Sequence, residues 1–255
     1  MKFHFISSNT SEAIKAKEEY IKSYKQTDPE LADIIIPIGG DGILLKSLHD
    51  FNELDKPFFG INYGSVGFLM NSASNKDLKA LIKNSKTTDL KPLKMIAIDE
   101  DNKSYDSIAY NEVSLMRQSH QASKFQIKIN DITRMNELIC DGVLVSTSAG
   151  STAYNLSVHG PILGLNSNKL SIAPISPFRP RRWKGKIVSD RSKIVIQNLS
   201  PLKRPISAVA DNYEVRNAKS ITVKTNKKIK FNLLYDRNRS LQKKIKVEQL
   251  RKETS

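Results

Sequence analysis

A carboxylate enclosed by glycines is the first group in this sequence that could do chemistry. Gly39, Gly40, Asp41 and Gly42 directly follow the apolar run DIIIPI, which has the composition of a strand buried on both faces. Glycines let a ligand approach the backbone, and the N–H groups of a turn that opens a helix bind phosphate oxygens. The pattern favours a phosphate-binding turn that presents Asp41; the alternative is a tight turn in which Asp41 only caps the next helix. It is neither a Walker loop nor a GxGxxG dinucleotide fingerprint.

An amide and a carboxylate form the second candidate pair. Asn111 and Glu112 interrupt the largely apolar segment SIAYNEVSL. An amide side chain can read both donor and acceptor sites on an adenine edge or a ribose. The alternative is an edge strand whose polar residues face water.

A loop of small polar residues is the third candidate. The apolar strand that begins at Asp141 runs into the segment STSAGSTAYN. Small residues let a ligand approach the backbone, the hydroxyls of Ser151 and Thr152 offer hydrogen bonds, and Tyr154 offers a ring for a base to stack on. So many small polar residues in one loop favour a binding role over a packing role.

The elements that must position these residues change character near residue 90. Residues 2–6 alternate like a strand, residues 10–24 have helical spacing after a polar cap, and residues 34–39 and 57–70 predict further strands around a short helix that starts near Gly42. Such alternation predicts an α/β N-terminal domain with a small parallel sheet, whose ligand crevice lies at the carboxyl ends of the strands. Both glycine-rich loops follow such ends.

From Lys91 onward the sequence consists of short alternating segments separated by turns, which predict an antiparallel β-sandwich-like C-terminal domain. One hairpin is expected around Asn130 and Asp131. The predicted domains are residues 1–90, which carry the glycine-rich turn, and residues 91–255, which are β-rich and carry the loop of small polar residues and a basic C-terminal segment. The last residues, 240–255, are too polar to form a core and are expected to return to the first domain as a strand or helix, or to fray.

The composition limits the function classes. No apolar stretch approaches the roughly 20 residues of a membrane span, and the first residues lack the apolar core of a secretory signal, so a cytoplasmic location without membrane attachment is expected. Cys140 is the single cysteine, and the four histidines show no metal-ligand spacing, so no protein metal site is expected. The net charge of +15 lies in the C-terminal third, where it is interpreted as a solvated surface, with phosphate attraction as the alternative.

Together these segments resemble the NAD kinase family. The resemblance is carried by GGDG at 39–42, GINYGSVGFL at 60–69, NE at 111–112 and DGVLVSTSAGSTAYNLSVHGP at 141–161, in this order. Residues 209–211 are a weaker match. GGDG also occurs in lipid and sphingoid kinases, whereas the GSTAY loop is more specific to NAD kinases.

The resemblance implies a reaction and a set of roles. The expected reaction is phosphorylation of NAD at the 2′-hydroxyl of its adenosine ribose to give NADP, with Asp41 accepting the hydroxyl proton and Gly42 lying beside the ligand. Asn111 and Glu112 would contact the adenosine part, and Thr152 and Tyr154 the adenine. The remaining expected contacts are Asp141, Ala153 and Ala173 at the nicotinamide end, with Ala149, Asn155, Leu156 and Ser157 completing the pocket.

The resemblance also implies partners. ATP, or polyphosphate in its place, would donate the phosphate together with a divalent metal ion, expected to be Mg²⁺. A homo-oligomer, either dimer or tetramer, is expected. Ile43 stands where the family usually has threonine, which points to a changed affinity for the donor.

Two other functions compete with this interpretation. A lipid or sphingoid kinase would share the role of Asp41 but leaves Asn111 and the Thr152–Tyr154 segment unexplained. A catalytically weak nucleotide sensor, with Ile43 as the cause, is the second. Nucleic acid is not expected as a partner, because the basic stretches have few interleaved aromatic residues.

Overall fold

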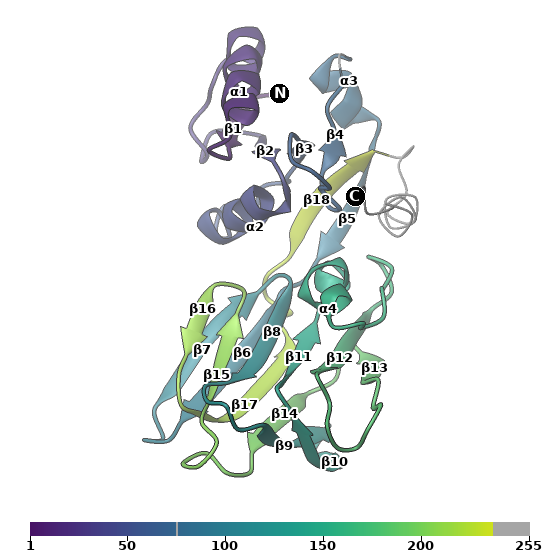
Figure 1. Ribbon diagram of the computed structural model, residues 1–255. Coiled ribbons are helices and arrows are strands. Elements are labelled where there is room, and N and C mark those ends of the chain that lie inside the picture. Colours follow the sequence, from purple (N-terminus) through teal and green to yellow (C-terminus); the bar gives the residue numbers. More distant parts are fainter. Residues whose placement is uncertain (75, 237–255) are drawn as a thin grey trace, which may run out of the picture. The chain divides into compact units, whose positions relative to one another are not determined.

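The computed structural model describes residues 1–74 and 76–236 (Figure 1). The chain divides into two compact units. The first contains Met1–Leu90 and the segment that starts at Ile229, and the second contains Lys91–Lys228. The expected structure of residues 240–255 lies outside the described residues. No described helix has both the length and the apolar character needed to cross a lipid bilayer.

The first unit is built on a parallel sheet with the strand order β1-β2-β3-β4. Its strands are β1 (Phe3–Ser7), β2 (Ile34–Gly39), β3 (Ile61–Asn62) and β4 (Asn71–Ser72), and its helices are α1 (Ser11–Tyr24), α2 (Asp41–Asp50) and α3 (Leu78–Lys83). Ala13 and Ala16 of α1 pack with Phe5 of β1 in one core. His4, the next residue along β1, instead meets Phe51 at the end of α2. Helices therefore cover both faces, because alternate strand residues point to opposite sides.

The second unit is a pair of six-stranded antiparallel sheets. One sheet has the order β10-β9-β14-β17-β6-β7 and the other β13-β12-β11-β8-β15-β16. The strands of the first are β6 (Leu93–Asp99), β7 (Ser104–Ala109), β9 (Ser123–Ile129), β10 (Ile132–Cys140), β14 (Ile194–Asn198) and β17 (Ala218–Thr225). The strands of the second are β8 (Glu112–Arg117), β11 (Gly142–Ser146), β12 (Lys169–Ile175), β13 (Lys186–Ser189), β15 (Ile206–Ala210) and β16 (Tyr213–Val215).

The two sheets share one apolar core. Leu93 and Phe125 from one sheet belong to the same buried cluster as Val143 and Ile172 from the other. Along β6 and β9 the core residues alternate with more exposed ones, as a sandwich requires, whereas β11 is buried throughout and β12 is buried from Leu170 onward. The predicted fold class, a small parallel sheet followed by an antiparallel β region, is confirmed.

The expected hairpin is also present. β9 pairs with β10 in antiparallel register, and Asn130 and Asp131 between them have φ values of 51° and 62°. Asparagine and aspartate tolerate this left-handed conformation better than most residues, which explains why they mark the turn.

Two segments differ from the sequence interpretation. SIAYNEVSL was expected to be one interrupted strand, but it forms β7 and β8 in different sheets, with Tyr110 and Asn111 at the crossing. KIKFNLLY was assigned to the sandwich, but β18 (Phe231–Asp236) pairs with β5 (Ser85–Leu90) in the first unit. Local alternation identifies a strand but carries no information about its partner, which here lies far away in sequence.

Candidate functional site

Asp41 is held in a fixed orientation by a distant loop of the same unit. It is the first residue of α2, and its carboxylate accepts the backbone N–H groups of Phe68 at 2.7 Å and Leu69 at 2.9 Å. Charge-assisted bonds of this kind are short and strong. A carboxylate oxygen has lone pairs for more than one partner, so this arrangement orients Asp41 and leaves its oxygens able to accept a further proton or hydrogen bond.

The two glycine-rich loops pack against each other. A Cβ added to Gly64 would lie 3.0 Å from the Cα of Gly40, so a larger residue would push the two loops apart by a few tenths of an ångström. Gly67 has a φ of 60° and packs against the Asn62 side chain. The amide nitrogen of Asn62 donates to the Val66 carbonyl, and its amide oxygen accepts the Gly64 N–H. The loops meet because they follow neighbouring parallel strands, as the sequence predicts.

The two glycines that flank Asp41 border open space. A Cβ added to Gly40 or Gly42 would meet no atom within 4 Å, and Gly42 is exposed. The next residue, Ile43, is partly buried and its Cγ2 atom lies 3.0 Å from where a Cβ on Gly39 would stand. Both neighbours of the partly buried Asp41 therefore have free space where a side chain would stand, while Ile43 packs back toward β2.

In the second unit, Asp211 fixes the crossing between β7 and β8. Its carboxylate accepts the backbone N–H groups of Tyr110 at 2.6 Å, Asn111 at 3.0 Å and Glu112 at 3.4 Å. Asp211 itself lies in the turn after β15 with a φ of 51°. The sequence shows only an aspartate in a turn, with no indication of its partners about a hundred positions earlier, so this residue was not among the expected site residues.

The small-residue loop packs directly on the same crossing. The Thr147 N–H donates to the Asn111 carbonyl at 2.9 Å, and the Thr147 hydroxyl donates to the Tyr110 carbonyl at 2.7 Å. A Cβ added to Gly150 would lie 2.2 Å from the Asn111 carbonyl oxygen, so Gly150 is required for the contact. The structure thus joins two of the segments that the sequence analysis selected separately.

Glu112 is an unusual acid within this group. Its Oε2 atom is buried and has no hydrogen-bond partner among the described residues. Burial, followed by the nearby Asp211 charge, raises the pKa of Glu112 to about 8. Glu112 is therefore mainly protonated at neutral pH and can donate a hydrogen bond, which an ionised glutamate would be unable to do.

Tyr154 lies close enough to Glu112 for the Glu112 charge to affect its pKa. Burial and then the Glu112 charge raise the pKa of the Tyr154 phenol, and its hydroxyl lies 3.6 Å from the Met116 sulfur on β8. Tyr154 begins the short helix α4 (Tyr154–Ser157) and is only partly buried. The ring is thus anchored at one end and keeps surface available for stacking.

Two polar side chains of the loop serve its own structure. The Ser151 hydroxyl donates to the Ser148 carbonyl at 2.8 Å and accepts the Leu163 N–H at 3.0 Å, and Ser151 is fully buried. The Asn155 amide nitrogen donates to the carbonyls of Ser151 and Pro161. The expectation that Ser151 offers its hydroxyl to a ligand is therefore wrong for this conformation, because that hydroxyl closes the loop.

Of the three residues expected at the nicotinamide end, Ala153 lies in the small-residue loop directly before Tyr154, while Asp141 and Ala173 lie directly before β11 and within β12. Asp141 precedes β11, whereas the small-residue loop follows β11. The Asp141 carboxylate pairs with Arg117 at 2.7 Å. Ala173 lies in the middle of β12 opposite Leu144 and is 0% exposed. The Tyr154 hydroxyl contacts the sulfur of Met116, which is the strand partner of Gly142, the residue next to Asp141. Of the other expected contacts, Ala149 and Thr152 are buried, Ala153 and Leu156 are partly exposed, and Ser157 is exposed.

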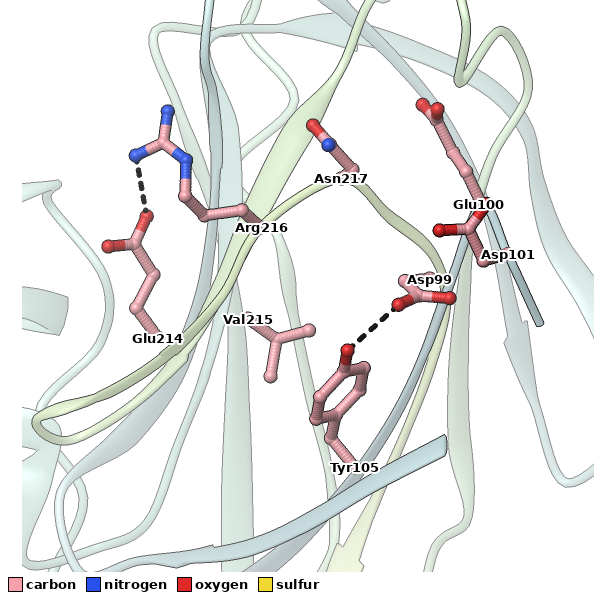
Figure 2. A pocket seen from close by; sticks show the side chains of 8 residues that line it. All are labelled: Asp99, Glu100, Asp101, Tyr105, Glu214, Val215, Arg216 and Asn217. Carbon is pink, nitrogen blue, oxygen red and sulfur yellow. Dashed lines mark hydrogen bonds and ion pairs between the residues drawn. The ribbon is translucent and has the colours of Figure 1, made fainter. Parts of the chain in front are cut away.

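A separate pocket of about 320 Å³ lies in the second unit (Figure 2). Four of its lining residues are acidic: Asp99, Glu100, Asp101 and Glu214. Tyr105 donates to Asp99, and Arg216 pairs with Glu214. None of the expected site residues lines this pocket, and its acidic walls disfavour a ligand that carries phosphates.

Comparison with known proteins covers both units. Residues 1–86 match the family model described as the ATP-NAD kinase N-terminal domain, and residues 110–238 match the ATP-NAD kinase C-terminal domain. An NAD kinase of Brucella suis is 44% identical over 248 residues, covering 97% of this chain and 96% of the relative. An NAD kinase of Caulobacter vibrioides is 43% identical over 245 residues, covering 96% of this chain and 94% of the relative.

Solved structures share the fold. Yeast NADH kinase complexed with NADH superposes with a TM-score of 0.80 at 21% identity, covering 100% of this chain and 89% of the other. An NAD kinase from Archaeoglobus fulgidus in complex with ATP gives a TM-score of 0.77 at 23% identity, covering 97% and 98%. With both family models matched, and with relatives this similar over nearly its whole length, the chain belongs to the NAD kinase family.

Proposed function

We propose that this chain transfers the terminal phosphate of ATP to the 2′-hydroxyl of the adenosine ribose of NAD, giving NADP and ADP, with Asp41 as the general base. The observation that carries the assignment of the base is the Asp41 carboxylate itself. It is oriented by the Phe68 and Leu69 N–H groups and bordered by open space at Gly40 and Gly42. Membership of the NAD kinase family supports the reaction.

The step requires one proton transfer and one substitution at phosphorus. Asp41 accepts the proton of the 2′-hydroxyl as the hydroxyl oxygen bonds to the terminal phosphorus, and the bond between that phosphorus and ADP breaks. Phosphoryl transfer depends chiefly on positioning and on neutralising charge. The N-terminus of α2 and the N–H groups of the glycine-rich turn supply partial positive charge beside Asp41.

A divalent metal ion, which we propose is Mg²⁺, would accompany the donor. The described residues contain no group of three or more His, Cys, Asp or Glu side chains arranged to hold a metal. This fits an ion bound mainly through the donor phosphates, as is usual for Mg²⁺. When bound, such an ion neutralises charge on the transferring phosphate.

The adenosine part is assigned to the second unit. Tyr154 provides a partly exposed ring for stacking. Thr152 of the same loop and Asn111, whose backbone packs on that loop, provide polar groups. Protonated Glu112 donates a hydrogen bond to an acceptor oxygen or nitrogen of the nucleoside. Asp211 acts through Asn111 and Glu112 as a positioning residue, because it binds their backbone N–H groups.

The remaining assignments are also proposals. Asp141, Ala153 and Ala173 contact the nicotinamide end, and neighbouring chains of a homo-oligomer complete each site, as the family resemblance implies. A cytoplasmic location and the use of polyphosphate as an alternative donor stay predictions. The comparisons give no support to a lipid or sphingoid kinase or to a sensor.

The role of the base is tested by Asp41→Asn. An amide at this position does not accept the hydroxyl proton, so kcat for NADP formation from NAD and ATP should fall by about 100- to 10,000-fold. Asp50→Asn is the matched control, because it makes the same change at the exposed end of the same helix and should leave kcat within about twofold. An Asp41→Asn enzyme that keeps most of its activity would refute the role of Asp41.

The positioning role of Asp211 is tested by Asp211→Asn. The variant puts an NH₂ group near N–H groups that need an acceptor, so the Asn111–Glu112 segment should shift. We expect the KM for NAD to rise about tenfold while the KM for ATP stays nearly constant. Asp101→Asn, in an exposed turn of the same unit, should change neither value. Equal changes in both KM values would indicate general damage to the fold and contradict the assignment.

The state of Glu112 is tested by the pH dependence of stability. Folding raises the pKa of Glu112 from 4.5 to about 8. Between these two pH values Glu112 is therefore protonated in the folded protein and ionised in the unfolded chain. The free energy of unfolding therefore contains a contribution that is complete below the unfolded pKa and is lost as pH rises through the folded pKa. Glu112→Gln mimics the protonated acid and lacks this loss.

The stability of Glu112→Gln relative to the wild-type protein should consequently increase between about pH 5 and about pH 8, as measured by urea unfolding at both values. Glu100→Gln, in the same unit and outside the site, serves as the control for a change of charge. If the difference between Glu112→Gln and wild type were the same at both pH values, Glu112 would not be protonated at neutral pH.

A further inference from the structure

A basic cleft of about 500 Å³ lies at one end of the sheet that contains β14, β17 and β6. Its lining includes six cationic side chains and one carboxylate, Asp190. The cations are Lys94, Arg191, Lys193, Lys224, Lys227 and Lys228. None of these residues belongs to the candidate functional site, and all of them lie in the second unit.

Most of this positive charge is not neutralised by the protein. Lys94 pairs with Asp106, and Lys193 pairs with Asp131 at 2.9 Å. Arg191, Lys224, Lys227 and Lys228 are exposed and form no ion pair with any described residue. A concavity with one sign of charge concentrates the electrostatic potential and attracts counter-ions of the opposite sign.

Two lysines of the cleft lie on adjacent strands of the sheet, and only Lys94 of the two has an ion-pair partner among the described residues. Lys94 on β6 stands directly opposite Lys224 on β17 in the strand register. Like charges in directly opposed positions destabilise an antiparallel pair. The Asp106 carboxylate offsets the charge of Lys94, whereas Lys224 keeps its charge available for a bound anion.

The walls of the cleft are held by the protein itself. The Thr225 hydroxyl donates to the Asp190 carbonyl at 2.6 Å, and the Asn226 N–H donates to the Pro92 carbonyl at 2.8 Å. The Lys228 N–H donates to the Asn226 side chain at 3.0 Å. The backbone that carries the unpaired cations is thus already ordered, which lowers the entropy lost on binding.

We propose that this cleft is a second anion site, which binds an inorganic oligophosphate of three or more linked phosphates. The unpaired cations match the several negative charges of such a chain. No aromatic side chain of the described residues lines the cleft, so these residues offer no surface on which a nucleobase could stack. The site is independent of Asp41 and of the reaction proposed above.

Calorimetric titration of the full chain with sodium tripolyphosphate tests the site. A triple variant that combines Lys224→Gln, Lys227→Gln and Lys228→Gln should bind tripolyphosphate about tenfold more weakly than the wild-type protein. The control combines Lys184→Gln, Lys186→Gln and Lys203→Gln, which removes the same charge from exposed positions outside the cleft. It should bind within about twofold of the wild type.

Two results would overturn the proposal. Undiminished binding by the cleft variant would place tripolyphosphate elsewhere, for example at the glycine-rich turn. An equal loss in both triple variants would show that net charge alone governs binding. Circular dichroism of each variant verifies folding, which exposed Lys→Gln changes are expected to preserve.

Discussion

Backbone N–H groups held by a distant carboxylate determine the shape of both functional regions. Asp41 binds the N–H groups of Phe68 and Leu69, and Asp211 binds those of Tyr110 and Asn111. Loops at strand ends leave N–H groups without ladder partners, and an unmade hydrogen bond on a buried amide is costly. A carboxylate satisfies two or three of them at once. The same bonds that stabilise the loops therefore fix the groups that we assign to proton transfer and to adenosine binding.

The sandwich positions its polar groups at the points where the chain changes sheets. β7 and β8 belong to different sheets, as do β10 and β11, and the crossings carry Asn111 and Asp141 respectively. At such a crossing the strand ladder is interrupted, so backbone and side-chain groups become available for other partners. Here the partners are Asp211 at one crossing and Arg117 at the other. The site is thus a consequence of the topology, while the apolar residues of both sheets only hold it in place.

Short-range chemistry made much of the fold predictable from sequence. Three features follow from local residue types and lie where they were expected. They are the glycine-rich turn with Asp41, the hairpin at Asn130 and Asp131, and the loop around Tyr154. Other features depend on pairings between residues far apart in the chain. They are the pairing of β18 with β5, the placement of β7 and β8 in different sheets, and the hydrogen bond from the Asn111 N–H to the Asp211 carboxylate. Residue types alone do not specify such pairings. Ser151 shows the same limit, because a hydroxyl that could bind a ligand is used to close its own loop.

The central claim is that this chain phosphorylates one particular hydroxyl of NAD. Its most direct test is to incubate the purified chain with NAD, ATP and Mg²⁺ and to locate the new phosphate in the product by ³¹P and ¹H NMR. The account predicts a single dinucleotide product with a monophosphate on the 2′-oxygen of the adenosine ribose, formed together with an equal amount of ADP. A phosphate on any other hydroxyl, or ATP consumption without a phosphorylated dinucleotide, would contradict it.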